Sequence, residues 1–393
     1  MTELESAADR RHRIECAQRN KGRIQHDPHR RGNLFARIMT DNILFDYRVI
    51  DRDQADKDCD LSRRTSVHHI IRDCLSLQGL SSEGTNAERA MRAFQMDNGP
   101  NAFTRSYSRD SFPAILDNIG SKAMSLGFDR APEVWPFIVR QTTTKDFKPF
   151  TRVTAPEYPS PEKVIENGQI TRPQLGDDSK ETASIGAYPF LVSLSRQAVI
   201  NDDLNALTVT AEAAGRAASR LNGDLVFSVL TDNNAMADSV TLFHATHGNV
   251  GTPSAPSITA LNEIRNLMGL QVGSSGEVLN IRLAIVVGAP NMESTLTTIR
   301  DASSSLQPDP LTPGYQAGYV SVVTDGRLTG TAWYAIGDPR IHSGIDLVAL
   351  EGSERPLLER QTVFVSDAIE WKVLHDAVAL PVDYRTLVYN AGA

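Results

Sequence analysis

Apolar side chains recur every three or four positions over several long stretches of this chain, which is the spacing of an amphipathic helix. The strongest stretch predicts a helix over Asp203 to Thr231, and Asn201 and Asp202 just before it are residues favoured at a helix N-terminus. At 1.5 Å per residue this helix would be about 40 Å long. One face consists of Leu207, Ala211, Ala214, Ala218, Leu221, Leu225 and Val229. Because many of these side chains are small, a second backbone could pack closely against this face.

The same periodicity predicts shorter helices on both sides of this long one. They are Val67–Leu77, Ala87–Phe94, Phe112–Phe128, Ser257–Leu270 and Asn291–Ala302. Ser111 is a candidate N-cap for the third of them, and Pro113 falls in its first turn. The segment 97–111 is rich in Gly, Pro, Asn and Ser, so it is the best candidate for a domain boundary.

Alternating or continuous apolar runs predict strands between and after these helices. The predicted strands are 43–50, Asp146–Val153, Tyr188–Leu194, Ile281–Val287, Tyr319–Val323, Ala332–Ile336, Gly344–Leu350, Gln361–Val365 and Ile369–Leu374. Helices and strands are mixed without an internal repeat. The expected fold class is therefore α+β.

Residues 154–181 separate two of the predicted strands and contain four prolines and two glycines. A structureless loop of this length is uncommon inside a compact domain. A two-stranded hairpin alone is also marginally stable in water. We therefore expect a long hairpin that gains its order by lying across an adjacent subunit. Its candidate assembly residues, which would be buried there, are Val164, Ile165, Ile170 and Leu175.

Composition narrows the functional classes. The net charge is −8, yet the first 37 residues hold nine basic and five acidic side chains. An acidic body disfavours sequence-specific duplex binding, whereas the basic N-terminal segment is either a solvated terminus or a contact for a polyanion. No apolar run approaches the length of a transmembrane helix, and the charged N-terminus predicts no secretory signal. Cys16, Cys59 and Cys74 have no metal-binding or disulfide spacing.

The sequence contains no phosphate-binding loop, nucleophile elbow or zinc-protease motif. The one constellation that could carry chemistry is FHATHGN, where His244 and His247 could share a metal ion. The alternative, which we favour, is a turn in which these imidazoles bind backbone groups, since Gly248-Asn249 is typical of a turn. We expect no enzyme activity and no cofactor, and a metal-dependent hydrolase using these histidines is the less favoured hypothesis.

Seven blocks of the sequence, in order, resemble the Mu-like phage major head subunit (gpT-like) family. They are DSFPAILDNIGSKAMSLGF (110–128), TTTKDFKPFTRV (142–153), SRQAVINDDLNAL (195–207), FHATHGN (243–249), NIRLAIVVGAP (280–290), AWYAIGDP (332–339) and EWKVLHDAVALPVDYR (370–385). Together they cover about 110–390. The resemblance implies the Hong Kong 97-type capsid fold.

The resemblance also implies a domain layout. An N-terminal segment would cover 1–110, partly extended and with two short helices, and an N-arm helix region 111–144. The extended E-loop hairpin would cover 145–195, and the peripheral P-domain, with its spine helix 203–231, would cover 196–256. The axial A-domain would span 257–350, and 351–393 would return to the P-domain.

The implied function is that of a major capsid (head) protein, which self-assembles as hexamers and pentamers into an icosahedral shell enclosing double-stranded phage DNA. An encapsulin-like protein compartment is the alternative within the same fold. The implied partners are other copies of the chain, a portal, a scaffold or prohead protease, decoration proteins, and packaged DNA contacted non-specifically on the inner face, with no membrane. The implied location is the virion, and the host cytoplasm during assembly.

Overall fold

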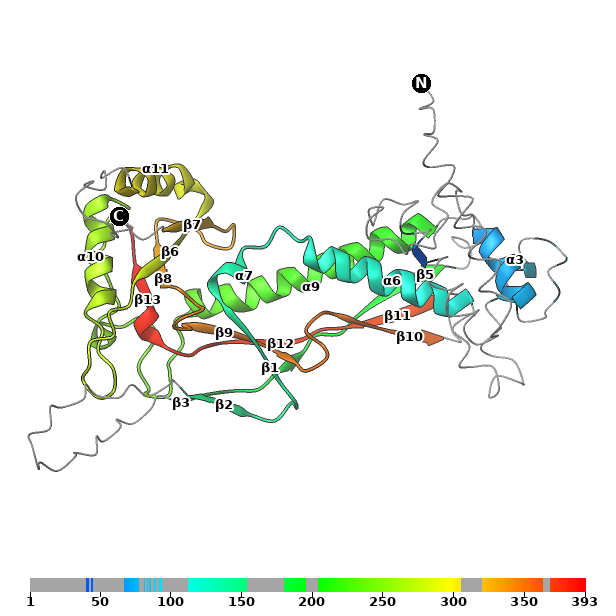
Figure 1. Cartoon of the computed structure of the whole chain (residues 1–393), viewed down its shortest axis with the longest axis horizontal. Coiled ribbons are helices and arrows are strands. Elements are labelled where there is room, and N and C mark those ends of the chain that lie inside the picture. The colour runs from blue at the N-terminus through cyan, green and yellow to red at the C-terminus, as the bar shows by residue number, and fades with distance from the viewer. Residues whose placement is uncertain are drawn as a thin grey trace, which may run out of the picture. The chain divides into compact units, whose positions relative to one another are not determined.

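The structure of the chain is a computed structural model. It describes residues 112–153, 180–195, 204–304, 320–362 and 368–393, and before them helix α3 and a few single residues between 40 and 93. The chain divides into two compact units. One contains 1–131, 189–218 and 355–375, and the other contains 132–188, 219–354 and 376–393. Figure 1 labels most of the helices and strands of both units, numbered in chain order.

In the first unit, helices pack on a three-stranded antiparallel sheet of order β10-β11-β5. Its elements are α3 (Val67–Leu77), α6 (Phe112–Asp129), β5 (Phe190–Ser195), β10 (Leu357–Thr362), β11 (Ala368–Leu374) and the first half of α9 (Leu204–Asp232). The indole of Trp371 on the central strand is fully buried and donates to the carboxylate of Asp117 on α6 at 2.7 Å. This bond fixes the helix over the sheet.

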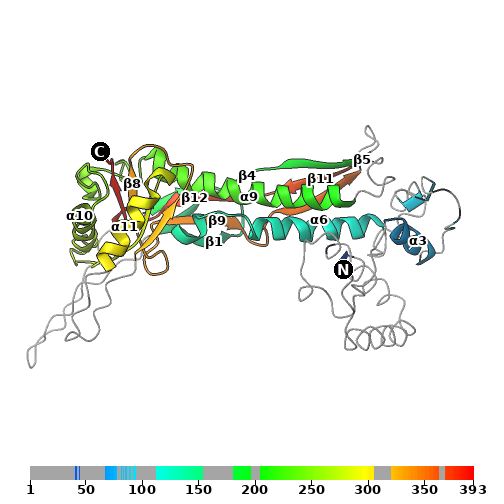
Figure 2. The same cartoon turned by 90° about the horizontal axis from the view of Figure 1, so that it is seen from above.

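Helices α6 and α9 run side by side in both views (Figures 1 and 2), and glycines let their backbones nearly touch. A Cβ atom at Gly215 would overlap the carbonyl oxygen of Met124, and one at Gly127 would overlap the carbonyl oxygen of Glu212. The small side chains Ala211, Ala214 and Ala218 on the same stretch of α9 are buried. Only small residues fit such a contact.

The second unit contains two four-stranded sheets. The first, of order β1-β9-β12-β4, consists of β1 (Arg140–Thr144), β9 (Ile345–Leu350), β12 (Asp376–Pro381) and β4 (Gly186–Ala187). The second, of order β13-β8-β6-β7, consists of β13 (Leu387–Asn390), β8 (Trp333–Gly337), β6 (Leu283–Gly288) and β7 (Ser321–Thr324). Pairing is parallel between β1 and β9 and between β6 and β7, and antiparallel elsewhere.

Helices α10 (Ile258–Gly269) and α11 (Glu293–Ser304) pack against the second sheet (Figure 1). Ser257 caps α10, since its hydroxyl accepts from the backbone N–H of Ala260 at 3.1 Å. Short helices complete the unit: α7 (Trp135–Ile138) and the 3-10 turns η2 (Ala245–His247), η3 (Pro290–Met292) and η4 (Tyr384–Thr386). A further hairpin pairs β2 (Phe150–Val153) with β3 (Lys180–Ala183).

The α+β class is confirmed, and most predicted elements are present within a few residues of their expected bounds. The strand predicted at 43–50 is wrong at Leu44, which is helical and fully buried, so tertiary packing overrides its strand propensity. The strand predicted from Asp146 begins only at Phe150, after bends that end in Pro149. The strand predicted from Tyr188 begins after Pro189, which has no N–H to donate to the sheet.

The predicted strand Gln361–Val365 is displaced. Strand β10 covers Leu357–Thr362, and 363–365 lie outside the described residues. The sequence analysis predicts no strand at β1, β3, β4, β12 or β13. Two of them, RQTTT and KETA, are almost wholly polar, so apolar periodicity cannot reveal them.

Candidate assembly site

The strand predicted from Tyr188 does not close the long hairpin as expected, because it is β5 and pairs with β11 in the first unit. The second strand of the hairpin is instead β3, so the stem consists of β2 and β3. Among the described strands it forms a two-stranded sheet of its own, with Phe150 paired to Ala183 and Val153 to Lys180. At its root, Phe150 and Ala183 pack against a buried cluster of Val348, Leu380 and Val382. The segment 154–179 follows the last pair and lies outside the described residues, and with it Val164, Ile165, Ile170 and Leu175.

Asp346, in the middle of β9, is a buried carboxylate on which the root of this stem converges. It has no exposed surface. The guanidinium of Arg140 donates to both carboxylate oxygens, at 3.0 and 2.8 Å, from the neighbouring strand β1. The hydroxyl of Ser343 donates to it at 2.5 Å, and the Nε of Arg152 on β2 lies 3.7 Å from its Oδ2. One buried negative charge therefore joins β1, β2 and β9.

Both strands of the stem are also held by polar contacts at the pair Arg152–Glu181. Arg152 also donates to the hydroxyl of Thr142 at 2.7 Å. Its cross-strand partner Glu181 is buried and accepts from the backbone N–H of Ala237 at 3.0 Å. Charge-assisted hydrogen bonds of this kind are directional, so they fix the direction in which the hairpin leaves the unit.

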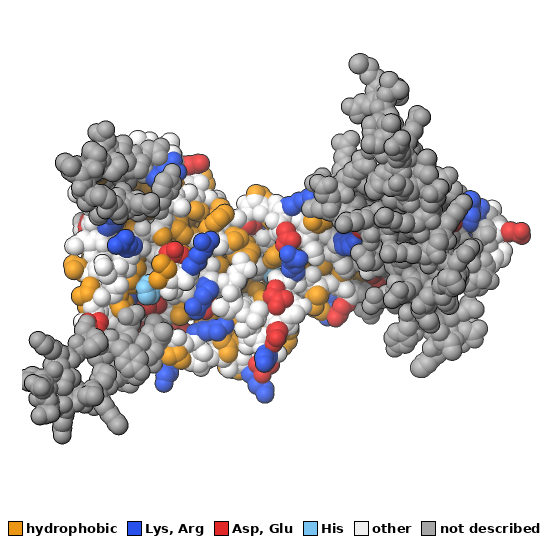
Figure 3. Space-filling model, viewed as in Figure 1, with side chains coloured by type: hydrophobic (Ala, Val, Ile, Leu, Met, Phe, Trp, Pro, Cys, Tyr) orange, Lys and Arg blue, Asp and Glu red, His pale blue; other side chains and the backbone are white. Residues whose placement is uncertain are grey.

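Several apolar side chains are exposed on regular elements and tight turns of the second unit. Figure 3 shows apolar side chains lying among basic ones over one face of the described surface. Two of them, Val272 and Val278, lie on the hairpin 271–279 and are 49% and 59% exposed, and Leu270, directly before the hairpin, is 63% exposed. Val272 and Val278 form an antiparallel bridge between the hydrogen-bonded pairs 271/279 and 273/277, so their side chains lie on one face. Exposed apolar groups held in fixed positions are typical of interaction surfaces.

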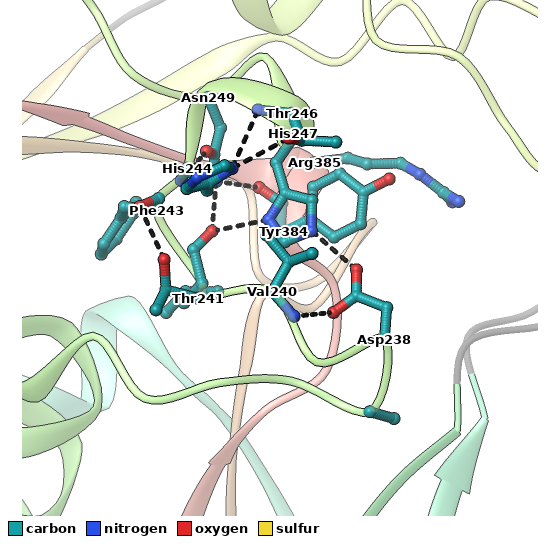
Figure 4. A network of polar contacts seen from close by, with 12 residues as sticks. Asp238, Val240, Thr241, Phe243, His244, Thr246, His247, Asn249, Tyr384 and Arg385 are labelled. Carbon is teal, nitrogen blue, oxygen red and sulfur yellow. Dashed lines mark hydrogen bonds and ion pairs between the residues drawn. The ribbon is translucent and has the colours of Figure 1, made fainter.

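The FHATHGN turn is shown in Figure 4. His244 caps η2, because its Nδ1 accepts from the backbone N–H of Thr246 at 3.1 Å. His247 is buried and stacks on Tyr384, with ring centres 3.9 Å apart. Its Nε2 lies 2.8 Å from the carboxylate of Asp238, and its Nδ1 lies 3.1 Å from the carbonyl of Leu242. Both ring nitrogens of His247 therefore have protein partners.

The carboxylate of Asp238 is stabilised in its charged form by this arrangement. Burial acts to raise its pKa, but the hydrogen bonds that the carboxylate accepts from His247 and from the N–H of Val240 outweigh burial and hold the pKa below its ordinary value. Gln271 extends the network by donating to the carbonyls of His247 and Gly248 at 3.1 and 3.2 Å. The FHATHGN turn is therefore hydrogen-bonded to the first residue of the 271–279 hairpin and holds its base in place.

No group of three or more His, Cys, Asp or Glu side chains lies in a metal-binding arrangement within the described ranges. In the same part of the chain, no helix is long and apolar enough to cross a lipid bilayer. The two histidines of the FHATHGN turn are engaged in capping and in the Asp238 network, which is the arrangement that the turn interpretation predicts.

On α9, the predicted packing positions differ in exposure. Ala211, Ala214 and Ala218 are buried, Leu221 and Leu225 are half-buried, and the side chain of Leu207 lies outside the described residues. In the second half of the helix the buried positions are Ser219, Asn222, Gly223, Val226, Phe227 and Leu230. The buried stripe therefore turns around the helix axis, because an apolar face shifts over many turns when its spacing differs from 3.6 residues.

Sequence reasoning missed the polar residues that organise the site. One group of ion pairs joins Asp346 to Arg140 and Arg152. A second group is centred on Arg327, whose guanidinium contacts Glu133, Asp224 and Asp325 at 2.9, 2.5 and 3.0 Å. Burial disfavours the charge of Arg327, but the hydrogen bonds to Asp224 and Glu133 outweigh burial and raise its pKa. One signal was available: Asp346 interrupts the apolar run of its strand, IDLVAL, and a charge there needs a partner.

The chain resembles several solved shell proteins at low sequence identity. It is similar to a virus-like particle from Pyrococcus furiosus, with 11% identity, coverage of 68% of this chain and 96% of that chain, and a TM-score of 0.42. The capsid of Ralstonia phage GP4 is 12% identical over 62% of this chain and 83% of that chain, with a TM-score of 0.44. The holo-SrpI encapsulin complex of Synechococcus elongatus is 10% identical over 66% of this chain and 89% of that chain, with a TM-score of 0.41. No curated protein matches the sequence.

A family model assigns the chain more firmly than these structural similarities do. The phage capsid protein family matches residues 180–390, which include β3, the whole of α9, both helices that pack on the second sheet, and β13. This range is more than half of the chain, and the chain therefore belongs to the phage capsid protein family.

Proposed function

We propose that this chain builds an icosahedral shell around double-stranded phage DNA by laying the tip of its hairpin, 154–179, across an adjacent copy. That the chain is a capsid protein, and so a virion component that packs against copies of itself, follows from its family. The contact through which copies recognise one another is the proposed step.

The hairpin stem is the observation that carries this proposal. Its two strands form no larger sheet with the other described strands, yet its root is held by Asp346, Glu181 and a buried apolar cluster. Because the stem is held firmly at its own subunit, it can direct segment 154–179 toward an adjacent copy. Burying Val164, Ile165, Ile170 and Leu175 on a neighbour would contribute ~1.5–3 kcal/mol each before the cost of ordering the segment.

We extend the proposal to the domain layout expected from the sequence. The hairpin 145–195 is the E-loop, and α9 is the spine helix of a P-domain formed by 196–256 and 351–393. The region 257–350, with α10 and α11 against the second sheet, is the A-domain. The Mu-like head subunit subfamily is the finer assignment, and it is supported by the seven sequence blocks that occur in that family's order.

The partners follow from the same proposal. Copies of the chain form hexamers and pentamers, with a portal, a scaffold or prohead protease and decoration proteins completing the particle during assembly in the host cytoplasm. The basic N-terminal segment, with nine basic and five acidic residues in its first 37, supports non-specific contact with packaged DNA on the inner face.

Two alternatives are less well supported. An encapsulin-like compartment would share the fold but hold protein cargo, and the matched family is one of phage capsids. A metal-dependent hydrolase would need His247 as a ligand, and both of its ring nitrogens already face Asp238 and the carbonyl of Leu242.

The test replaces 158–176 with a short Gly-Ser turn in the full chain. We expect an unchanged circular dichroism spectrum and thermal transition, because the stem and its root remain, but no closed shells by electron microscopy. A matched control replaces Ser274-Ser275, at the tip of the 271–279 hairpin, with Gly-Gly. That variant should fold and still form shells. Normal shells from the 158–176 variant would show that the hairpin is not an intersubunit element.

A further inference from the structure

We propose that the turn 338–343, which displays Ile341, is the surface on which segment 154–179 of a second copy docks. This inference rests on the proposed function, since it names the receiving side of the hairpin contact. It is carried by three features: the exposure of Ile341, the charge around it, and the connection of the turn to the hairpin stem.

Ile341 is the most exposed of the large apolar side chains in the described part of the chain, at 73%. Its exposure is fixed by the backbone of the turn. The carbonyl of Asp338 accepts from the N–H groups of Ile341 and His342 at 3.1 and 3.0 Å, and its carboxylate accepts from the N–H of Arg340 at 2.9 Å. A turn held by three hydrogen bonds presents this side chain in one position, which lowers the entropy lost on binding.

The surroundings of Ile341 are basic. Arg340 beside it is exposed, and so is Arg282, which precedes the pair Leu283–Gly337 and therefore lies at the same end of the β6–β8 ladder as the turn. Two nearby acids reduce this positive charge without reversing it. Asp338 is half-buried and accepts from the turn's own backbone, and Asp383 is buried beside Arg385 at 3.8 Å. The surface therefore fits a ligand that is both apolar and acidic.

Segment 154–179 has that composition. It carries the acidic residues Glu157, Glu162, Glu166, Asp177 and Asp178, the basic residues Lys163 and Arg172, and the four aliphatic residues named above. Aliphatic side chains could cover Ile341 while carboxylates meet the two arginines. About 13 residues out and 13 back reach roughly 45 Å when extended, which is enough to cross to another subunit.

The receiving turn and the donating stem are joined within each subunit through Asp346. Ser343, at the end of the turn, and Arg152, on the stem, both contact its carboxylate. Each copy would thus give a hairpin and receive one, and Asp346 contacts both the donating stem and the receiving turn. A head-to-tail contact of this kind forms a ring when the rotation between successive copies closes, and an open filament when it does not. Asp346 is accordingly a positioning residue for closure.

The test places a photoreactive phenylalanine analogue at position 341 of the full chain. Particles are assembled from equal amounts of 14N- and 15N-labelled protein, irradiated, digested and analysed by mass spectrometry. We expect the main cross-link to join position 341 to a peptide from 154–179, with mixed isotope pairs showing that it joins two copies. A cross-link only within one copy, or one to any other segment, would overturn the proposal.

Two further placements of the photoreactive analogue complete the test. The same analogue at Leu270, which is 63% exposed, is the matched control and should not select 154–179. If the analogue at 341 prevents assembly, the analogue at Arg340 should give the same cross-link. Equal labelling of 154–179 from positions 270 and 341 would contradict the proposal. Failure of the unmodified chain to form shells would instead contradict the proposed function.

Discussion

At the scale of single residues, the root of the hairpin depends on Asp346. A carboxylate without exposed surface is costly unless its charge is matched, and here Arg140, Arg152 and Ser343 match it. The arginines come from sequence positions far from 346, on β1 and β2. The contacts of Asp346 with these three residues therefore form only when β1, β2 and β9 are assembled. Once formed, they hold β2, and with it the hairpin, in one direction.

We predict that Asp346→Asn lowers the free energy of unfolding by about 2 kcal/mol, because Arg140 and Ser343 lose a charged hydrogen-bond acceptor and Arg152 loses its counter-charge. Urea denaturation measures this change. The control is Asp224→Asn, since Asp224 also pairs with an arginine but is 64% exposed, and it should cost less than about 1 kcal/mol. Equal effects of the two substitutions would show that burial of Asp346 carries no special weight.

A second prediction concerns pH. His375 is buried against Phe128, with ring centres 5.8 Å apart, and burial lowers its pKa from 6.5 to about 4. Between these values the unfolded chain takes up a proton that the folded chain does not, so stability falls as the pH drops from about 6.5 to 4. The full effect is about 3 kcal/mol.

This prediction is checked by urea denaturation at several pH values for the wild-type chain and for His375→Gln. The wild-type stability should decline more steeply between pH 6.5 and 4 than that of the variant, which has no titrating ring. Parallel pH profiles for the two proteins would rule out His375 as a source of acid sensitivity.

At the scale of elements, the α6–α9 contact should be sensitive to a single methyl group. Gly215→Ala would place a Cβ on the carbonyl oxygen of Met124, and backbone on both sides leaves little room for adjustment. We expect a loss of about 1–3 kcal/mol in unfolding free energy. Gly269→Ala, in α10, is the control: no atom lies within 4 Å of its added Cβ, so it should be neutral or slightly stabilising.

Thermal denaturation of the two variants separates packing from helix propensity. Both substitutions replace glycine by alanine in a helix, and propensity alone would stabilise both. A higher melting temperature for Gly215→Ala would therefore contradict the close approach of the two backbones.

The elements that could be predicted from the sequence are those with a local signal. The range of α9 follows from apolar spacing and its capping residues, and the burial of Ala211, Ala214 and Ala218 agrees with the inference that small side chains admit a close neighbour. Strand β1 gives no such signal, since RQTTT is polar and its pairing with β9 depends on a partner about 200 residues away. The ion pairs of Asp346 are equally non-local, although a charge inside IDLVAL indicates that a partner exists.

At the scale of the whole molecule, function depends on contacts that one subunit cannot make alone. The described surface exposes Ile341, Leu270, Val272 and Val278 on turns and a short hairpin fixed by hydrogen bonds. An apolar side chain buried between two copies contributes modestly, but a closed shell repeats such a contact at every subunit. A loss of a few kcal/mol per copy therefore decides between free subunits and particles.

The most direct test of the central claim is electron microscopy of the purified full-length chain, with mass photometry of the same sample. We predict closed shells of uniform diameter, and a mass distribution dominated by large particles with free subunits as a minor species. A population that consists only of monomers or small oligomers, at concentrations where the chain is folded, would contradict the account.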